Sequence, residues 1–137
     1  MSRLAPPSGE PPPGLIRLPG SVTVALEPVA EVVCKRYYAE FPDEHDRYGD
    51  AGEAWCRHDN LYLLAWAIGE AELGSVDFDE QVSWLATILS ARSFPLDRLA
   101  RDLELASEAL LERHPGLVSS AAVLRRGASL VRPSSED

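Results

Sequence analysis

Residues 61–68 read Leu-Tyr-Leu-Leu-Ala-Trp-Ala-Ile, an unbroken run of apolar and aromatic side chains. The run lies inside a longer stretch with helical spacing, residues 50–73, which stops at Gly74. A helix that is hydrophobic on every side is normally surrounded by other helices. The sequence therefore predicts a buried central helix over about residues 50–73, with the rest of the domain packed around it.

Four further helices are expected along the chain. Pro28 suits the first turn of a helix, where its missing N–H costs nothing, and Pro42 ends that helix. Asp77 and Glu80 have the spacing of a capping box at the start of another helix. Because short links join the segments, the expected fold is all-α, either globin-like or a bundle of about five helices. The four expected ranges are 27–41, 77–90, 96–113 and 117–131.

The helix expected over residues 96–113 carries charges at four-residue spacing. Asp97 and Arg101 are four apart, as are Arg98 and Asp102. Side chains at this spacing lie on one side of a helix, and each such pair stabilises it by about 0.2–0.5 kcal/mol. Both pairs are therefore predicted to lie on the outer face of the helix.

The two ends of the chain have a different composition. Residues 1–20 hold six of the eleven prolines and cannot bury enough apolar surface to offset the entropy of ordering them. The predicted organisation is a Pro-rich disordered or extended arm over 1–20, a single helical domain over 21–131 and a flexible tail over 132–137.

The composition argues against several functional classes. The formal net charge is −9, whereas binding to nucleic acid or to anionic membranes needs a basic surface. No apolar run approaches the ~20 residues of a membrane span, and the N-terminus lacks the apolar core of a secretory signal. Cys34 and Cys56 lie in helix-like segments, with no sign of a disulfide scaffold. A cytoplasmic location is therefore expected.

Catalytic signatures are also missing from the sequence. It has no Gly-rich phosphate loop, nucleophile elbow, His-Glu-x-x-His or Cys-x-x-Cys motif, so the chain is not expected to be an enzyme. The densest group of potential metal ligands is Asp43-Glu-His-Asp46. Only Asp43 and Asp46 of this group can share a helix face, so an acidic, solvated first turn is favoured over a metal site.

A carboxylate among large aromatic residues is the main candidate site. Trp55, Asp59, Tyr62 and Trp66 follow one another at spacings of four, three and four, which places them on one stripe of the central helix. They could line a flat pocket for a planar conjugated ligand, with Asp59 accepting hydrogen bonds from ligand N–H groups. Alternatively the stripe is ordinary core, and Asp59 is hydrogen-bonded at the margin between two helices.

His58 is a second candidate on the same helix. It is expected on a different face from Asp59, aligned with Ala54 and Leu61. A neutral imidazole there could ligate a haem iron or a cobalt, or it could be a core histidine whose hydrogen bonds are satisfied.

A set of short motifs is spread over about residues 28–112. Its members are Arg47-Tyr48-Gly49, Cys56, Asp59, Tyr62, Leu64, Trp84, Ala91-Arg92, Pro95 and Leu99. In these residues the sequence resembles a helical module found N-terminal to cobalamin-binding domains in bacterial sensory and regulatory proteins. One position departs from it, since Leu63 stands where the module has histidine after the tyrosine.

The resemblance implies an all-helical fold reminiscent of globins and bilin proteins, with Asp59 and Tyr62 at a tetrapyrrole pocket. A cobalamin-binding domain of its own is not expected within 137 residues.

Two functions follow as expectations. The first is a non-catalytic sensory or regulatory domain that binds a tetrapyrrole (biliverdin, haem or cobalamin) beside the central helix. The second is a protein-interaction or dimerisation module with no small-molecule ligand, whose partner is another protein or a second copy of the chain. The site residues expected for the first function are Trp55, His58, Asp59, Tyr62 and Trp66.

Overall fold

The computed structural model describes residues 7–133 and confirms the predicted all-helical bundle. The expected helix ranges differ from the observed ones by at most one residue, apart from the central helix. Residues 1–6 of the predicted arm and 134–137 of the predicted tail lie outside the described residues. The elements are β1 (Leu15–Leu18), β2 (Val22–Ala25), α1 (Glu27–Glu40), α2 (Asp43–Ile68), the π-helical turn η1 (Gly69–Leu73), α3 (Phe78–Ala91), α4 (Leu96–Arg113) and α5 (Val118–Val131).

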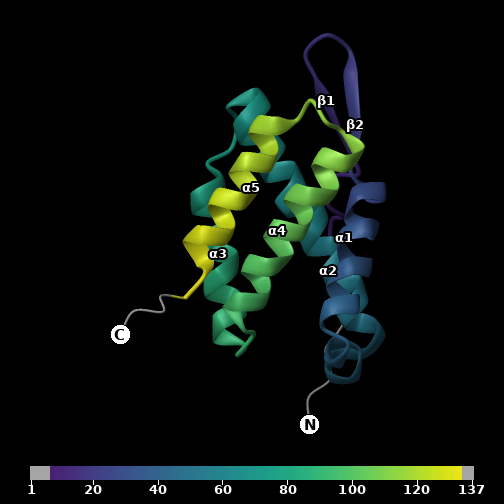
Figure 1. Cartoon of the computed structure of the whole chain (residues 1–137), viewed down its shortest axis with the longest axis vertical. Helices are drawn as coiled ribbons and strands as arrows, with labels where there is room; N and C mark the ends of the chain where they lie inside the picture. Colours follow the sequence, from purple (N-terminus) through teal and green to yellow (C-terminus); the bar gives the residue numbers. More distant parts are fainter. Residues whose placement is uncertain (1–6, 134–137) are drawn as a thin grey trace.

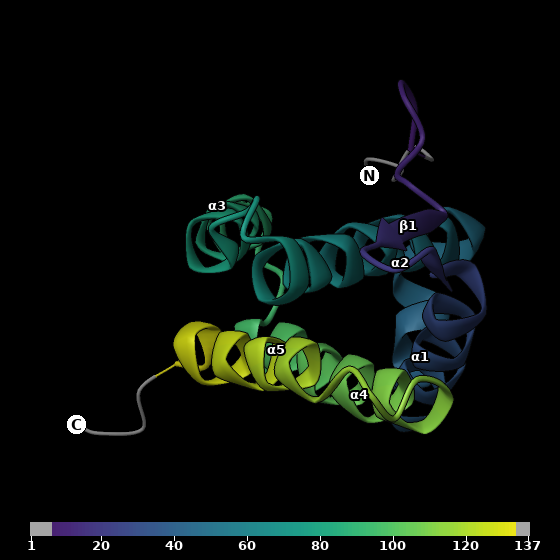
Figure 2. The same ribbon diagram turned by 90° about the horizontal axis from the view of Figure 1, so that it is seen from above.

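The helices form two layers, which Figure 2 shows from above. α2 and α3 make one layer, α4 and α5 make the other, and α1 joins the two layers at one end. Fully buried side chains from every helix fill the space between them, among them Leu64 of α2, Phe78 of α3 and Leu103 of α4. None of the helices between residues 7 and 133 combines the length and the apolar character needed to cross a membrane.

The central helix starts near Asp50 as expected. α2 as a whole runs from Asp43, but Gly49, with φ 62° and ψ −155°, separates the acidic turn from the apolar helix. α2 does contact each of the other four α-helices, as a central helix should. It is not surrounded, however, because Tyr62 and Trp66 are only half-buried while Leu63 and Leu64 are fully buried. The prediction of a helix buried on every side was therefore wrong for one side of α2.

A β-hairpin occupies part of the predicted Pro-rich arm and projects from the bundle beside α1 (Figure 1). β1 pairs antiparallel with β2, with Leu15 opposite Ala25 and Leu18 opposite Val22. The base of the hairpin is closed by the Leu26 N–H, which donates to the Gly14 carbonyl at 2.8 Å. Leu26 itself is fully buried. Residues 15–18 are thus a paired strand that belongs to the domain, and disorder is the wrong description for them.

The charged pairs predicted within α4 are replaced by long-range ones. Arg98 does not pair with Asp102; its guanidinium donates to Asp43 and to the buried Glu44 and lies 4.4 Å from the centre of the Phe41 ring. Asp102 is only 6% exposed, so it faces the interior rather than the solvent. A partner offered by another helix outweighs the few tenths of a kcal/mol of an exposed pair within one helix.

Two further ion pairs join α1 to α4. Arg101 donates to Glu40 through Nε and Nη2 at 2.9 and 2.8 Å, where Asp97 was the expected partner. Arg36 donates to both carboxylate oxygens of Glu112, at 2.9 and 2.7 Å. Together with Arg98, these contacts hold α1 and the start of α2 against α4.

The close approach of α3 and α5 at Gly127 gives a test of the packing. A methyl group at this position would lie 2.5 Å from Cε2 of the fully buried Phe78. We expect Gly127→Ala to destabilise the fold by about 1–2 kcal/mol, because overpacking outweighs the ~1 kcal/mol that alanine gains over glycine in a helix. Urea unfolding of the wild type and the variant measures the difference.

Gly116→Ala is the matched control, because nothing lies within 4 Å of the added methyl group there. Its unfolding free energy should stay within about 0.5 kcal/mol of the wild type. A Gly127→Ala protein more stable than the wild type would contradict the described α3–α5 contact.

Candidate functional site

Four rings on α2 form a continuous row, here called the aromatic row: Trp55, His58, Tyr62 and Trp66. Ring centres are 5.0 Å apart for Trp55 and His58, 5.1 Å for His58 and Tyr62, and 5.6 Å for Tyr62 and Trp66. The first two contacts are edge-to-face, at 73° and 69°, and the third is tilted at 33°. Such arrangements are favourable for aromatic pairs, so neighbouring rings hold one another in place.

His58 belongs to this row, and the prediction that it faces another side of the helix was wrong. It follows Trp55 by three residues and precedes Tyr62 by four, which are the spacings that bring side chains together on a helix. Its Nδ1 lies 3.1 Å from Oδ1 of Asp59, although the two residues are adjacent in sequence. Asp59 thus contacts the row through His58.

In the His58–Asp59 pair, a carboxylate lies within hydrogen-bond distance of one nitrogen of the imidazole. Both side chains are largely covered, with 20% and 26% of their surface exposed. Burial raises the pKa of Asp59, while the hydrogen bond from His58 and the charge of Arg92 act in the opposite direction. With the proton on Nδ1 donated to Asp59, Nε2 of His58 carries a free lone pair. Histidines that bind metals commonly use this arrangement, in which a carboxylate accepts from the other ring nitrogen.

The aromatic row is a surface feature rather than the lining of a described hollow. All four residues are half-buried. One hollow of about 580 Å³ lies at the corner between α1 and α2 and is here called the corner groove; its lining includes Cys34, Tyr38, His45 and Glu53. A second, smaller hollow lies between α3 and α4. Neither of these two hollows is lined by any of the five predicted site residues.

A buried polar cluster lies on another side of α2. It was not predicted from the sequence. Nδ2 of Asn60 donates to Oδ1 of Asp102 on α4 at 3.0 Å and to the Cys56 carbonyl at 2.9 Å. The same amide nitrogen lies 3.8 Å from the Cys34 sulfur and 3.6 Å from the Cys56 sulfur. Asn60 is 1% exposed, so α1, α2 and α4 meet here on polar groups inside the core.

Burial changes the titration of two groups in this cluster. It raises the pKa of Asp102 to about 7, against the opposing effect of the Asn60 hydrogen bond. A hydrogen bond with Cys34, together with burial, raises the pKa of the Cys56 thiol. Both cysteines are free thiols. The low-polarity interior thus disfavours the charged forms of Asp102 and Cys56.

The acidic segment at the start of α2 was expected to be a solvated first turn, and this is wrong for Glu44, which is only 2% exposed. Asp43 and Glu44 both bind Arg98. His45 instead forms an ion pair with Glu53 beyond the kink, with Nδ1 and Oε2 2.9 Å apart. Sequence spacing could not reveal this pair, because the backbone at Gly49 is not helical.

The raised pKa of Asp102 predicts how stability depends on pH. The folded state keeps its proton up to about pH 7, whereas the unfolded chain loses it near pH 4. The contribution of Asp102 to the free energy of unfolding is therefore fully present below about pH 4, and it is lost as the pH rises to about 7. We expect the unfolding free energy of Asp102→Asn, relative to the wild type, to rise by about 4 kcal/mol across this range, as an upper bound.

Urea unfolding of both proteins at closely spaced pH values measures this difference. Asp59→Asn is a useful comparison, since the pKa of Asp59 is raised in the same direction. Parallel curves for the wild type and Asp102→Asn would show that Asp102 has the same pKa in the folded and unfolded states, and would contradict the raised pKa.

Comparison of the chain with protein-family models, with curated proteins and with solved structures gave no match.

Proposed function

We propose that this chain is a non-catalytic sensory or regulatory domain whose aromatic row binds one face of a planar tetrapyrrole. The observation that supports this most is the row itself, in which four rings contact one another along one partly exposed side of α2. A reducing compartment such as the cytoplasm suits the two free thiols of this domain.

The dimensions of the row suit a large flat ligand. Eleven residues separate Trp55 from Trp66, so the row extends roughly 16 Å along the helix axis. Aromatic rings contribute large apolar contact areas and pack well against conjugated ligands. Their mutual contacts also limit the rotamer entropy that binding would cost.

The polar groups beside the row suit the same ligand class. His58 offers Nε2 to the iron of haem or the cobalt of cobalamin, with Asp59 bonded to its other nitrogen. For a bilin, which carries no metal, Asp59 offers a carboxylate oxygen to the pyrrole N–H groups. The resemblance to the module that precedes cobalamin-binding domains points to the same part of the helix, since Asp59 and Tyr62 are among its matching residues.

The second candidate is a protein-interaction or dimerisation module, and the open character of the row favours it. The row is half-buried and does not line either described hollow, so a protein surface could cover it directly. Tryptophan and tyrosine are enriched among the residues that contribute most to binding at protein interfaces.

Absorbance titration of the purified protein with biliverdin, haemin and hydroxocobalamin tests the proposal. We expect a saturable spectral change at one-to-one stoichiometry with one of these ligands. Trp66→Ala should weaken that binding at least about tenfold, the equivalent of 1.4 kcal/mol. Trp84→Ala is the matched control, because Trp84 lies on α3 outside the row and is 58% exposed; it should bind like the wild type.

The outcomes separate the two candidates. Spectra that remain the sum of protein and free ligand for all three compounds would overturn the tetrapyrrole proposal. If sedimentation then shows a dimer that dissociates with Trp66→Ala and persists with Trp84→Ala, the interaction module is the correct function.

A further inference from the structure

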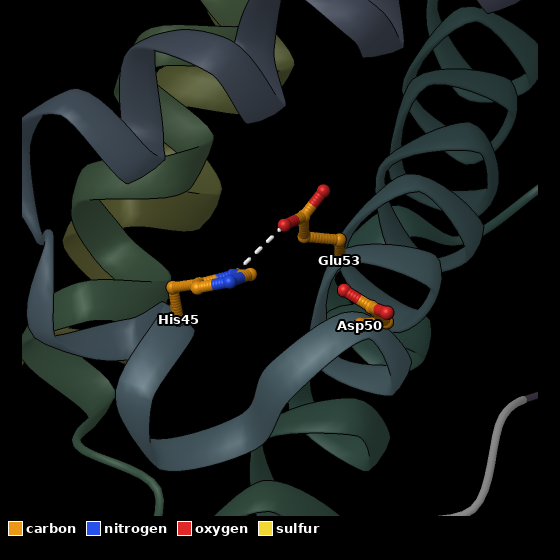
Figure 3. A group of neighbouring side chains, drawn as sticks. All are labelled: His45, Asp50 and Glu53. Atoms are coloured by element: carbon orange, nitrogen blue, oxygen red, sulfur yellow. Dashed lines mark ion pairs between the residues drawn. The ribbon is translucent and has the colours of Figure 1, made fainter.

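Three potential metal ligands converge at the kink of α2, away from the aromatic row (Figure 3). They are His45, Asp50 and Glu53, and one ligand atom from each lies within 4.8 Å of the other two. Figure 3 shows His45 facing Glu53 from the far side of the kink, with Asp50 on the same helical segment as Glu53. All three side chains are exposed, so they can adjust around an ion.

The fold builds this arrangement from two parts of α2. Gly49 has φ 62° and ψ −155°, a region open almost only to glycine, and it turns the segment with His45 back toward the rest of the helix. Asp50 and Glu53 are three residues apart beyond the kink, so they share one side of the helix. Asp43 and Glu44 hold the first segment in place through Arg98, which leaves His45 to face the two carboxylates.

Within the part of the chain that the structure describes, Asp50 and Glu53 form no ion pair with a lysine or an arginine. Within residues 7–133 the only ion pair of Glu53 is with His45, and Asp50 has none. Lys35 and Arg57 also line the corner groove with His45 and Glu53, and neither forms an ion pair with them. Two carboxylates side by side therefore face one imidazole. These three groups are ligands that a divalent cation could bind.

We propose that His45, Asp50 and Glu53 bind a divalent first-row transition metal such as Zn²⁺. The imidazole favours such a metal over Mg²⁺ or Ca²⁺, which prefer oxygen ligands alone. Zinc bonds of 2.0–2.2 Å place tetrahedral ligands roughly 3.4 Å apart, so the three side chains need to draw in by little more than 1 Å. His45 and Glu53 line the corner groove, which leaves the remaining coordination positions open to water.

Isothermal titration calorimetry with Zn²⁺, using the full chain, tests this site. We expect one equivalent to bind. His45→Ala, Asp50→Asn and Glu53→Gln should each weaken binding at least about tenfold, since even residues that only support a metal ligand contribute 10–100-fold. Asp46→Asn is the matched control for Asp50→Asn: Asp46 is exposed, lies next to His45 on the other side of the kink and is outside the cluster, so its loss should change affinity less than about threefold.

Several results would overturn the proposal. One is a wild-type protein that binds no stoichiometric Zn²⁺. Another is equal weakening by Asp46→Asn and Asp50→Asn, which would indicate attraction by diffuse negative charge. A third is loss of binding with His58→Ala but not with His45→Ala, which would move the ion to the aromatic row. Far-UV circular dichroism of each variant confirms that it is folded, which the exposure of the three side chains leads us to expect.

Discussion

The contact between Arg98 and the corner joining α1 to α2 is the interaction on which the rest of the structure depends. Arg98 donates to Asp43 and to Glu44, and Glu44 is only 2% exposed. A carboxylate this deeply buried needs a charged partner, since an unpaired buried charge costs several kcal/mol. The pairing fixes the start of α2 against α4. It thereby fixes the direction in which the helix continues after the kink at Gly49. The positions of the aromatic row, the Asn60 cluster and the His45 group follow from that direction.

α2 carries a different chemistry on each of its sides. The aromatic row faces outward and is partly open, which suits contact with a flat ligand or a partner. The Asn60 side turns inward to Asp102 and the two thiols, where burial raises the pKa of Asp102 and of Cys56. The kinked end presents His45 and two carboxylates to solvent. One helix can serve all three roles because successive residues project about 100° apart.

Local signals in the sequence predicted the helices. They did not predict the contacts between helices. The cap at Asp77 is confirmed by its hydrogen bond from the Glu80 N–H. The hairpin was missed although Pro19-Gly20 between two β-prone runs is a turn signal, because the prolines around it dominated the composition. His58 could have been placed in the row from its spacing alone. Asp102 could not be placed, since its partner Asn60 lies 42 residues away, and the His45–Glu53 pair depends on a backbone turn that helical spacing does not describe.

The order of helices along the chain also bears on how the bundle assembles. α4 and α5 pack side by side and are joined by only four residues, 114–117. The ion pair between Arg36 and Glu112 instead joins residues 76 apart in sequence. Closing the longer loop costs roughly 3 kcal/mol more in chain entropy, because this cost grows with the logarithm of loop length. The α4–α5 pair is therefore the contact with the smaller entropy cost, and docking of α1 onto α4 is the contact with the larger one.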